Sequence, residues 1–258
     1  MNLEQLIFKL TNVDPESSGV RGYSVAVFEL FAKLDWLLHR TTYHGLLPTT
    51  GPMLMVANHT RAWDIAKGYR VGQRSGRIVR AFARATLLDP NLKESEEVRE
   101  RTGRKNDLLN NGPRWIRSRI AAILNGVEAI LIDRGGSLAE ARAFKERGRE
   151  ALGKGFLTAV FIMETREKSG RIVNPRPGAA YLAKNNPDIP IYPVGFSKNA
   201  ASIGPGFTYN QMIQDPDYGE LANSNFTVLL CDRIADQLPD PIRSDWYDDQ
   251  RQKILDRK

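Results

Sequence analysis

The chain has 258 residues, of which 41% are hydrophobic and 26% are charged, with a formal net charge of +7 at pH 7. This length supports one large domain, or one domain with a small helical appendage. Its single cysteine, Cys231, excludes an intrachain disulfide framework and a cysteine-rich metal site. The N-terminus shows no signal-like pattern, and no stretch approaches about 18 uninterrupted apolar residues. We therefore expect a cytoplasmic protein without an ordinary membrane-spanning helix.

The positive charge is concentrated in the middle of the sequence. Between Lys67 and Arg119 there are 14 basic and six acidic residues, so the rest of the chain is close to neutral. Such a segment favours an anionic partner, such as lipid head groups, coenzyme phosphates or nucleic acid, although it is also typical of a solvated surface. Because no nucleic-acid-binding module and no interleaving of basic and aromatic residues is recognisable, we do not expect nucleic acid as the partner.

The first predicted elements are helical. Residues 3–10 are compatible with a short helix, and Tyr23–Leu38 has apolar residues around most of its surface with a narrow polar strip. We assign residues 1–42 to an N-terminal helical extension and residues 43–258 to an α/β domain. The longer helix is expected to pack on that domain, and the alternative is that Trp36 and the neighbouring leucines dip into a lipid monolayer.

An apolar run that ends in a histidine comes next. Pro52–Ala57 suits a strand buried on both faces, and the residues from Ala62 onward read as a helix start. His59 precedes Asp64 by five positions, a spacing that neither a continuous strand nor a continuous helix brings together. A bend at the junction does, and the carboxylate then orients the imidazole as a general base for a substrate hydroxyl that attacks a carbonyl. The ordinary alternative is a capped turn.

Strands and helices alternate along the rest of the chain. The further predicted strands are Ile78–Ala83, Glu128–Arg134, Leu157–Met163, Ile189–Phe196 and Phe226–Cys231. The further predicted helices are one from Asp64 to about Ser75, Trp115–Leu124, Ala139–Leu152, one that begins at Pro177, and Trp246–Leu255. Residues 91–114 read as a charged loop or short helices. This alternation predicts an α/β fold with a mostly parallel central sheet flanked by helices.

Ligands of such sheets bind at the carboxyl ends of the strands. His59, Arg134 and Arg166 each follow a predicted strand. We therefore expect these three side chains to share one site.

Four ordered stretches resemble the signature blocks of the glycerolipid and lysophospholipid acyltransferase family, to which 1-acylglycerol-3-phosphate acyltransferases belong. They are Asn58-His59 with Asp64, Gly126 with the strand ending Ile132-Asp133-Arg134, Glu164-Thr165-Arg166, and Ile189–Phe196 with its two prolines. The third departs from the family's Phe-Pro-Glu-Gly-Thr-Arg-Ser, because Met163, Glu164 and Glu167 stand where the family has Glu, Gly and Ser. The missing glycine and the added negative charge argue against glycerol 3-phosphate or lysophosphatidate as the acceptor.

The resemblance implies an O-acyltransferase that moves a fatty acyl group from acyl-CoA or acyl carrier protein to a hydroxyl of a glycerolipid or another lipid-related acceptor. It makes His59 the general base and Asp64 the residue that orients it. The implied substrate-binding residues are Asn58, Arg61, Arg134, Glu164, Thr165 and Arg166. Asn58 would help to stabilise an oxyanion, and the arginines would hold anionic groups.

No metal and no cofactor beyond the acyl-CoA or acyl carrier protein co-substrate is expected. The partners are then the acyl thioester donor, the hydroxyl acceptor and an anionic membrane surface that the protein contacts peripherally. A non-catalytic lipid- or acyl-thioester-binding protein on the same fold is one alternative function. A thioesterase is the other, because water can replace the acceptor hydroxyl.

Overall fold

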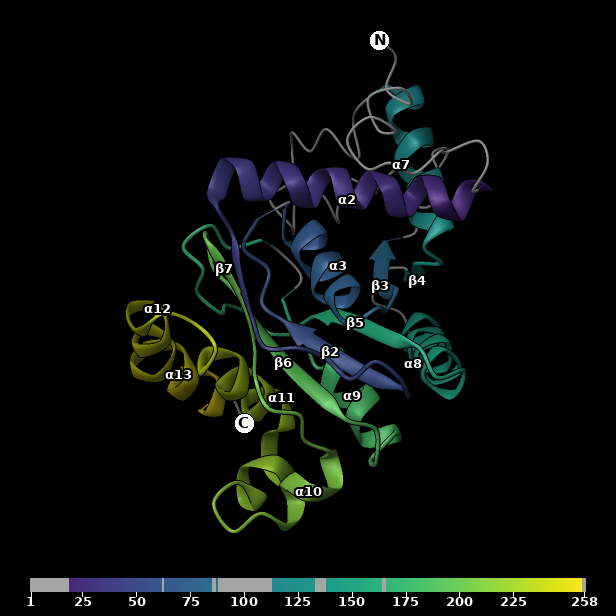
Figure 1. Cartoon of the computed structure of the whole chain (residues 1–258). Helices are drawn as coiled ribbons and strands as arrows, with labels where there is room; N and C mark the ends of the chain where they lie inside the picture. The colour runs from purple at the N-terminus through teal and green to yellow at the C-terminus, as the bar shows by residue number, and fades with distance from the viewer. Residues whose placement is uncertain are drawn as a thin grey trace.

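A seven-stranded sheet forms the centre of the protein (Figure 1). The computed structural model describes residues 19–61, 63–84, 87, 113–132, 138–163 and 166–256. The strands are β1 (Thr42–His44), β2 (Met53–Ala57), β3 (Val79–Arg84), β4 (Ile130–Ile132), β5 (Leu157–Phe161), β6 (Ile191–Phe196) and β7 (Ala200–Ile203). Their order is β1-β7-β6-β2-β5-β3-β4, and β6 and β7 are the only antiparallel neighbours among them. The prediction of an α/β fold with a mostly parallel sheet is confirmed.

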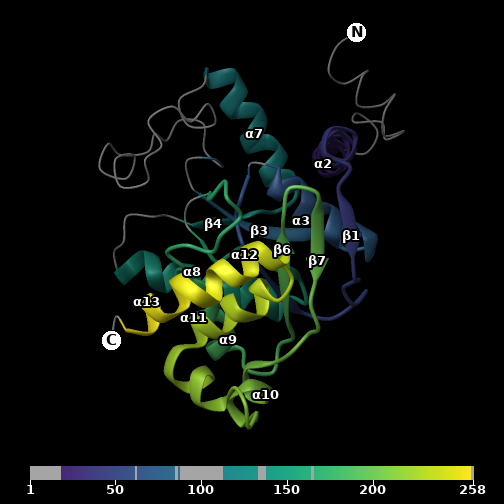
Figure 2. The same ribbon diagram turned by 90° about the vertical axis from the view of Figure 1, so that its left-hand side faces the viewer.

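Helices cover both faces of this sheet (Figure 2). One face carries α2 (Gly19–His39), α3 (Asp64–Arg74) and α7 (Arg114–Gly126). The other carries α8 (Leu138–Gly153), α9 (Gly178–Asn185), α10 (Tyr209–Gln214) and α11 (Gly219–Ala235). The chain ends in α12 (Asp240–Asp245), a π-helical turn (Trp246–Gln250) and α13 (Arg251–Leu255), which pack beside α11. Most predicted helices and strands are thus found, with ends that differ by a few residues.

The central strand β2 explains why its sequence shows no polar alternation. Leu54 and Val56 belong to the core on the α9 and α11 side. Met53, Met55 and Ala57 belong to the core under α2 and α3. All five residues are buried, as expected for a strand of a parallel sheet that is covered on both faces. The continuous apolar run is therefore the sequence signature of the strand that leads into His59.

The prediction of a strand at Phe226–Cys231 is wrong, because this segment lies inside α11. Val228, Leu229, Leu230 and Cys231 are all completely buried, so this part of the helix is apolar on every side. A helix that is covered all round lacks the 3.6-residue periodicity that distinguishes a helix from a buried strand in a short apolar run.

Two short strands were not predicted. Thr42–His44 and Ala200–Ile203 form β1 and β7, which pair in parallel at one edge of the sheet. They have three and four residues with little apolar pattern, so their pairing depends on the rest of the sheet rather than on local sequence. The predicted short helix at 3–10 and nearly all of the charged segment 91–114 lie outside the described residues.

The long helix α2 packs across α3 and α7, as expected. Its last turn differs from the rest because Trp36, Leu37 and Leu38 are 60%, 67% and 64% exposed. Within the part of the chain that is described, no helix combines the length and the apolar content required to cross a bilayer.

Candidate active site

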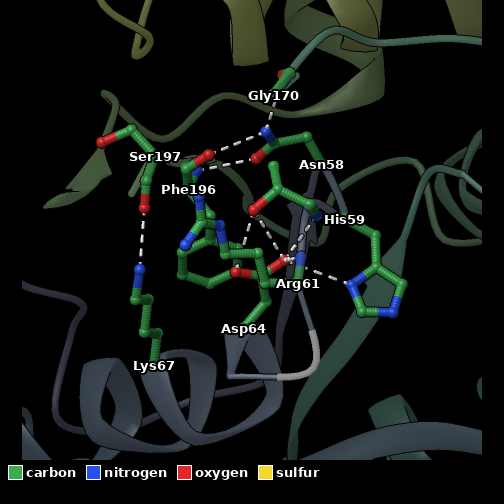
Figure 3. A network of polar contacts seen from close by, with 9 residues as sticks. Asn58, His59, Arg61, Asp64, Lys67, Gly170, Phe196 and Ser197 are labelled. Atoms are coloured by element: carbon green, nitrogen blue, oxygen red, sulfur yellow. Dashed lines mark hydrogen bonds and ion pairs between the residues drawn. The ribbon is translucent and has the colours of Figure 1, made fainter. Parts of the chain in front are cut away.

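The turn between β2 and α3 brings His59 and Asp64 together, as predicted. β2 ends at Ala57 and α3 begins at Asp64, so the backbone bends between them. His59 Nδ1 lies 3.3 Å from Asp64 Oδ2, at the long end of hydrogen-bond distances (Figure 3). The carboxylate is completely buried, whereas the imidazole is 12% exposed. Nδ1 is thus turned toward Asp64, and Nε2 is on the opposite edge of the ring.

Backbone groups of the same turn hold the Asp64 carboxylate. The main-chain N–H groups of Thr60 and Arg61 donate to Oδ2 at 2.5 and 2.7 Å. The Thr60 hydroxyl donates to the two carboxylate oxygens at 3.2 and 3.1 Å. Both N–H groups belong to the turn before α3, where the main chain has neither strand nor helix partners for them. The position of Asp64 is therefore fixed by the turn, independently of the imidazole.

Asn58 ties the end of β2 to the end of β6. Its Nδ2 donates to the carbonyl oxygens of Phe196 at 2.9 Å and Gly170 at 3.4 Å, and its Oδ1 accepts from Phe196 N–H at 2.7 Å. The side chain is completely buried. These bonds position the residue that precedes His59, while a direct contact between Asn58 and an oxyanion stays a prediction.

Lys67 is a buried residue of this site that sequence reasoning missed. It follows Asp64 by three positions on α3. Its Nζ donates to the carbonyl oxygen of Ser197 at 2.7 Å (Figure 3) and to that of Lys198 at 3.0 Å. Burial lowers the pKa of the Lys67 ammonium. The negative charges of Asp35 and Asp64 act in the opposite direction and raise it in part. The only signal in the sequence is a lysine one helical turn after the aspartate.

An aromatic ring and an apolar cavity adjoin the imidazole. His59 stacks on Phe161, the last residue of β5, with ring centroids 4.1 Å apart and planes at 16°. Phe161 and Asp64 line a cavity between the sheet and helices α2, α3 and α7. Its other lining residues are apolar apart from Tyr69, and include Phe28, Met55, Leu124 and Ala159.

Of the other predicted site residues, only Arg61 and Arg166 lie in the described part of the chain. Arg61 lies in the turn, and the charge of its guanidinium lowers the pKa of Lys67. Arg166 is half-buried, and the N–H of the next residue, Glu167, donates to the His59 carbonyl at 2.9 Å. The segment that carries Arg166 therefore runs against the β2–α3 turn. The remaining predicted residues, Arg134, Glu164 and Thr165, lie outside the described part of the chain.

Together, the fold and the turn define an α/β protein with an imidazole–carboxylate pair at the carboxyl end of a parallel sheet. In comparisons with known proteins, no family model, no curated protein and no solved structure matches the chain. Among the described residues, no group of three or more His, Cys, Asp or Glu side chains is arranged to hold a metal ion.

Proposed function

We propose that the protein is an O-acyltransferase that moves a fatty acyl group from an acyl thioester, carried by coenzyme A or acyl carrier protein, to a hydroxyl of a glycerolipid or another lipid-related acceptor. One observation carries this proposal: the His59–Asp64 pair adjoins an apolar cavity. Asp64 lines this cavity, as does Phe161, on which His59 stacks. A proton acceptor and a space for an alkyl chain thus occur at one end of the sheet.

The geometry of the pair supports the following proposed chemistry. Asp64 holds the proton on Nδ1 of His59, and Nε2 takes the proton of the acceptor hydroxyl while that oxygen attacks the thioester carbonyl. The new C–O bond forms first. The C–S bond then breaks as the imidazolium returns its proton to the leaving sulfur of the carrier. Asp64 stabilises the imidazolium that exists between these two steps.

The apolar cavity is assigned to the acyl chain. Its lining is almost entirely apolar and comes from β2, β3, β5 and the helices above them. Each methylene that leaves water contributes about 0.8 kcal/mol. We therefore assign the binding energy of the donor to this cavity and the anionic groups of the substrates to Arg61 and Arg166. The resemblance adds Arg134, Glu164 and Thr165 to these substrate contacts.

The exposed end of α2 supports peripheral contact with an anionic membrane surface. Trp36, Leu37 and Leu38 expose apolar side chains there, and the chain carries a net charge of +7. Aromatic and aliphatic side chains can enter the boundary between head groups and acyl chains, while basic residues interact with anionic lipids. Such contact would bring the protein to acceptors that reside in the membrane.

The direct test supplies purified protein with a long-chain acyl-CoA and a panel of lysolipids and alcohols. An acyltransferase should produce an acylated acceptor, whereas a thioesterase would release free fatty acid with or without acceptor. A non-catalytic protein would bind the thioester without consuming it. Either of the last two results, found with every acceptor and also with acyl carrier protein as donor, would reject the proposed transfer.

A cavity-filling variant tests the place of the acyl chain. Ala159 is a buried cavity residue of β5, so Ala159→Leu should lower transfer of long-chain relative to acetyl groups by about tenfold or more. The matched control, Ala139→Leu, makes the same change at an exposed position on α8 and should leave this ratio in place. If both variants keep the unmodified protein's ratio of long-chain to acetyl transfer, the acyl chain binds outside this cavity.

A further inference from the structure

Lys67 is buried between two regions that each contain a carboxylate. On its own helix, Asp64 precedes it by one turn. On α2, Asp35 is completely buried and acts on the same ammonium, because the charges of both carboxylates favour the protonated form of Lys67. An ammonium held by two carbonyl groups in such a place is costly to bury unless negative charge is close by.

Asp35 belongs to a second imidazole–carboxylate pair. His39 Nδ1 lies 3.1 Å from Asp35 Oδ1, and the Thr41 hydroxyl donates to Asp35 Oδ2 at 2.6 Å. The ring of His39 also meets Trp63, the residue before Asp64, edge to face with centroids 6.4 Å apart. The second pair therefore borders the β2–α3 turn on the side of α2.

The charged and polar groups near Lys67 come from several elements. They are Asp64 and Arg61 from α3 and its preceding turn, Asp35 with its partner His39 from α2, and the carbonyl groups of Ser197 and Lys198 after β6. On Tyr43 of β1, burial and then the charge of Asp35 raise the pKa of the phenol. Two of these groups, Asp64 and Asp35, are anions whose charges both act on the Lys67 ammonium.

We propose that Lys67 is a positioning residue for the His59–Asp64 pair, and that its buried ammonium couples this pair electrostatically to His39–Asp35. The ammonium fixes α3 to the end of β6 through Ser197 and Lys198. Asp64, one turn before Lys67 on the same helix, is thereby held beside the end of β6. The link to catalysis rests on the proposed acyltransferase function, whereas the electrostatic coupling does not.

The coupling predicts shifts of opposite sign when the two charges are removed. Lys67→Met keeps the unbranched stem as far as Cε and removes the ammonium with its positive charge, so the pKa of His59 should rise by about 0.5 or more. Asp35→Asn removes a negative charge at longer range, so the pKa of His59 should fall by about 0.3. A loss of packing alone has no reason to produce shifts of opposite sign.

NMR titration of the imidazoles measures this directly, since the chain has only three histidines. The third, the exposed His44, is the internal control. Lys154→Met is the matched charge control, because Lys154 is an exposed residue whose ammonium pairs with Glu150 at 2.5 Å. It should leave the His59 titration in place.

Unchanged His59 titration in folded Lys67→Met, or shifts of the same sign in both variants, would overturn the proposal. If Lys67→Met does not fold, Asp35→Asn decides: a fall in the pKa of His59 supports the coupling, and an unchanged value overturns it. In an acyl-transfer assay, the acid limb of kcat/KM should move to higher pH in Lys67→Met. Opposite shifts without acyl transfer by the unmodified protein would keep the coupling and reject the proposed function.

Discussion

Two imidazole–carboxylate pairs of nearly equal length occur in the described part of this protein. His39 lies 3.1 Å from Asp35, and His59 lies 3.3 Å from Asp64. Both carboxylates are completely buried, and both imidazoles are only slightly exposed. The distance between imidazole and carboxylate therefore does not show which pair has a chemical role.

The surroundings distinguish them. His39 and Asp35 are four positions apart on one helix, a spacing that any helix brings together. His59 and Asp64 meet only because a strand of the parallel sheet turns into a helix there, at the sheet end where ligands of such folds bind. The latter pair also adjoins the apolar cavity through Phe161. Position relative to the sheet and the cavity, rather than the contact itself, supports the role that we propose for His59–Asp64.

The largest expected difference between the two pairs is the loss of activity when each imidazole is replaced. His59→Gln removes the proposed base and should lower kcat/KM for acyl transfer by about 10² to 10⁴. His39→Gln makes the same change in the other pair and should lower it by no more than about threefold. Steady-state assays on both variants, with thermal unfolding to verify folding, check this difference. Similar losses in the two folded variants would contradict the roles assigned here.

Replacing Asp64 or Asp35 should lower stability in both cases, but only the replacement of Asp64 should strongly lower activity. Asp64→Asn leaves one oxygen for the N–H groups of Thr60 and Arg61 and no longer holds the same His59 tautomer, so activity should fall by about 10² or more. We expect Asp35→Asn to keep activity within about fivefold. Each change should lower the free energy of unfolding by about 1–3 kcal/mol, measured in urea. If Asp64→Asn loses stability but keeps activity, Asp64 has only a structural role.

Local sequence was enough to predict the His59–Asp64 pair, because its strand, its bend and both side chains lie in one stretch of chain. The apolar residues of β2 and the spacing of His59 and Asp64 were sufficient to predict a buried strand, a bend and a contact. The same reasoning placed most of the alternating strands and helices. It was wrong at Phe226–Cys231, because burial on every side removes the periodicity that identifies a helix.

The charged neighbours of this pair depend instead on contacts between distant parts of the chain. Lys67 bonds to the carbonyl groups of residues 130 and 131 positions away, and Asp35 reaches it from a different helix. In the sequence, Asp35 was one residue of a polar strip on α2, and nothing near it indicated burial beside a lysine. Tertiary packing decides such charge neighbours, so they follow from the fold and not from spacing.

Removing the threonine hydroxyl beside each carboxylate should have smaller effects. Thr41 donates to Asp35 at 2.6 Å, whereas Asp64 receives two main-chain N–H groups besides the Thr60 hydroxyl. Thr41→Val should therefore lower the free energy of unfolding by about 1–2 kcal/mol, and Thr60→Val by about half as much. Urea unfolding of the two isosteric variants measures the difference. A larger loss in Thr60→Val would mean that the main-chain donors do not hold Asp64.

The smallest effect concerns Tyr43 and is confined to alkaline pH. Burial, reinforced by the charge of Asp35, raises the pKa of Tyr43 from 10.0 to about 12. Between these values the unfolded chain loses the proton first, so the contribution of Tyr43 to stability is complete below pH 10 and is lost as pH rises through about 12. Its hydroxyl has no hydrogen-bond partner among the described residues, so Tyr43→Phe should change stability by less than about 1 kcal/mol at pH 7.

Unfolding free energies measured from pH 8 to 11 test this assignment. The unmodified protein should lose more stability above pH 10 than Tyr43→Phe, because only its tyrosine must keep a proton in order to stay buried beside Asp35. Parallel curves for the two proteins would show that burial and the charge of Asp35 do not raise the pKa of Tyr43 in the folded protein.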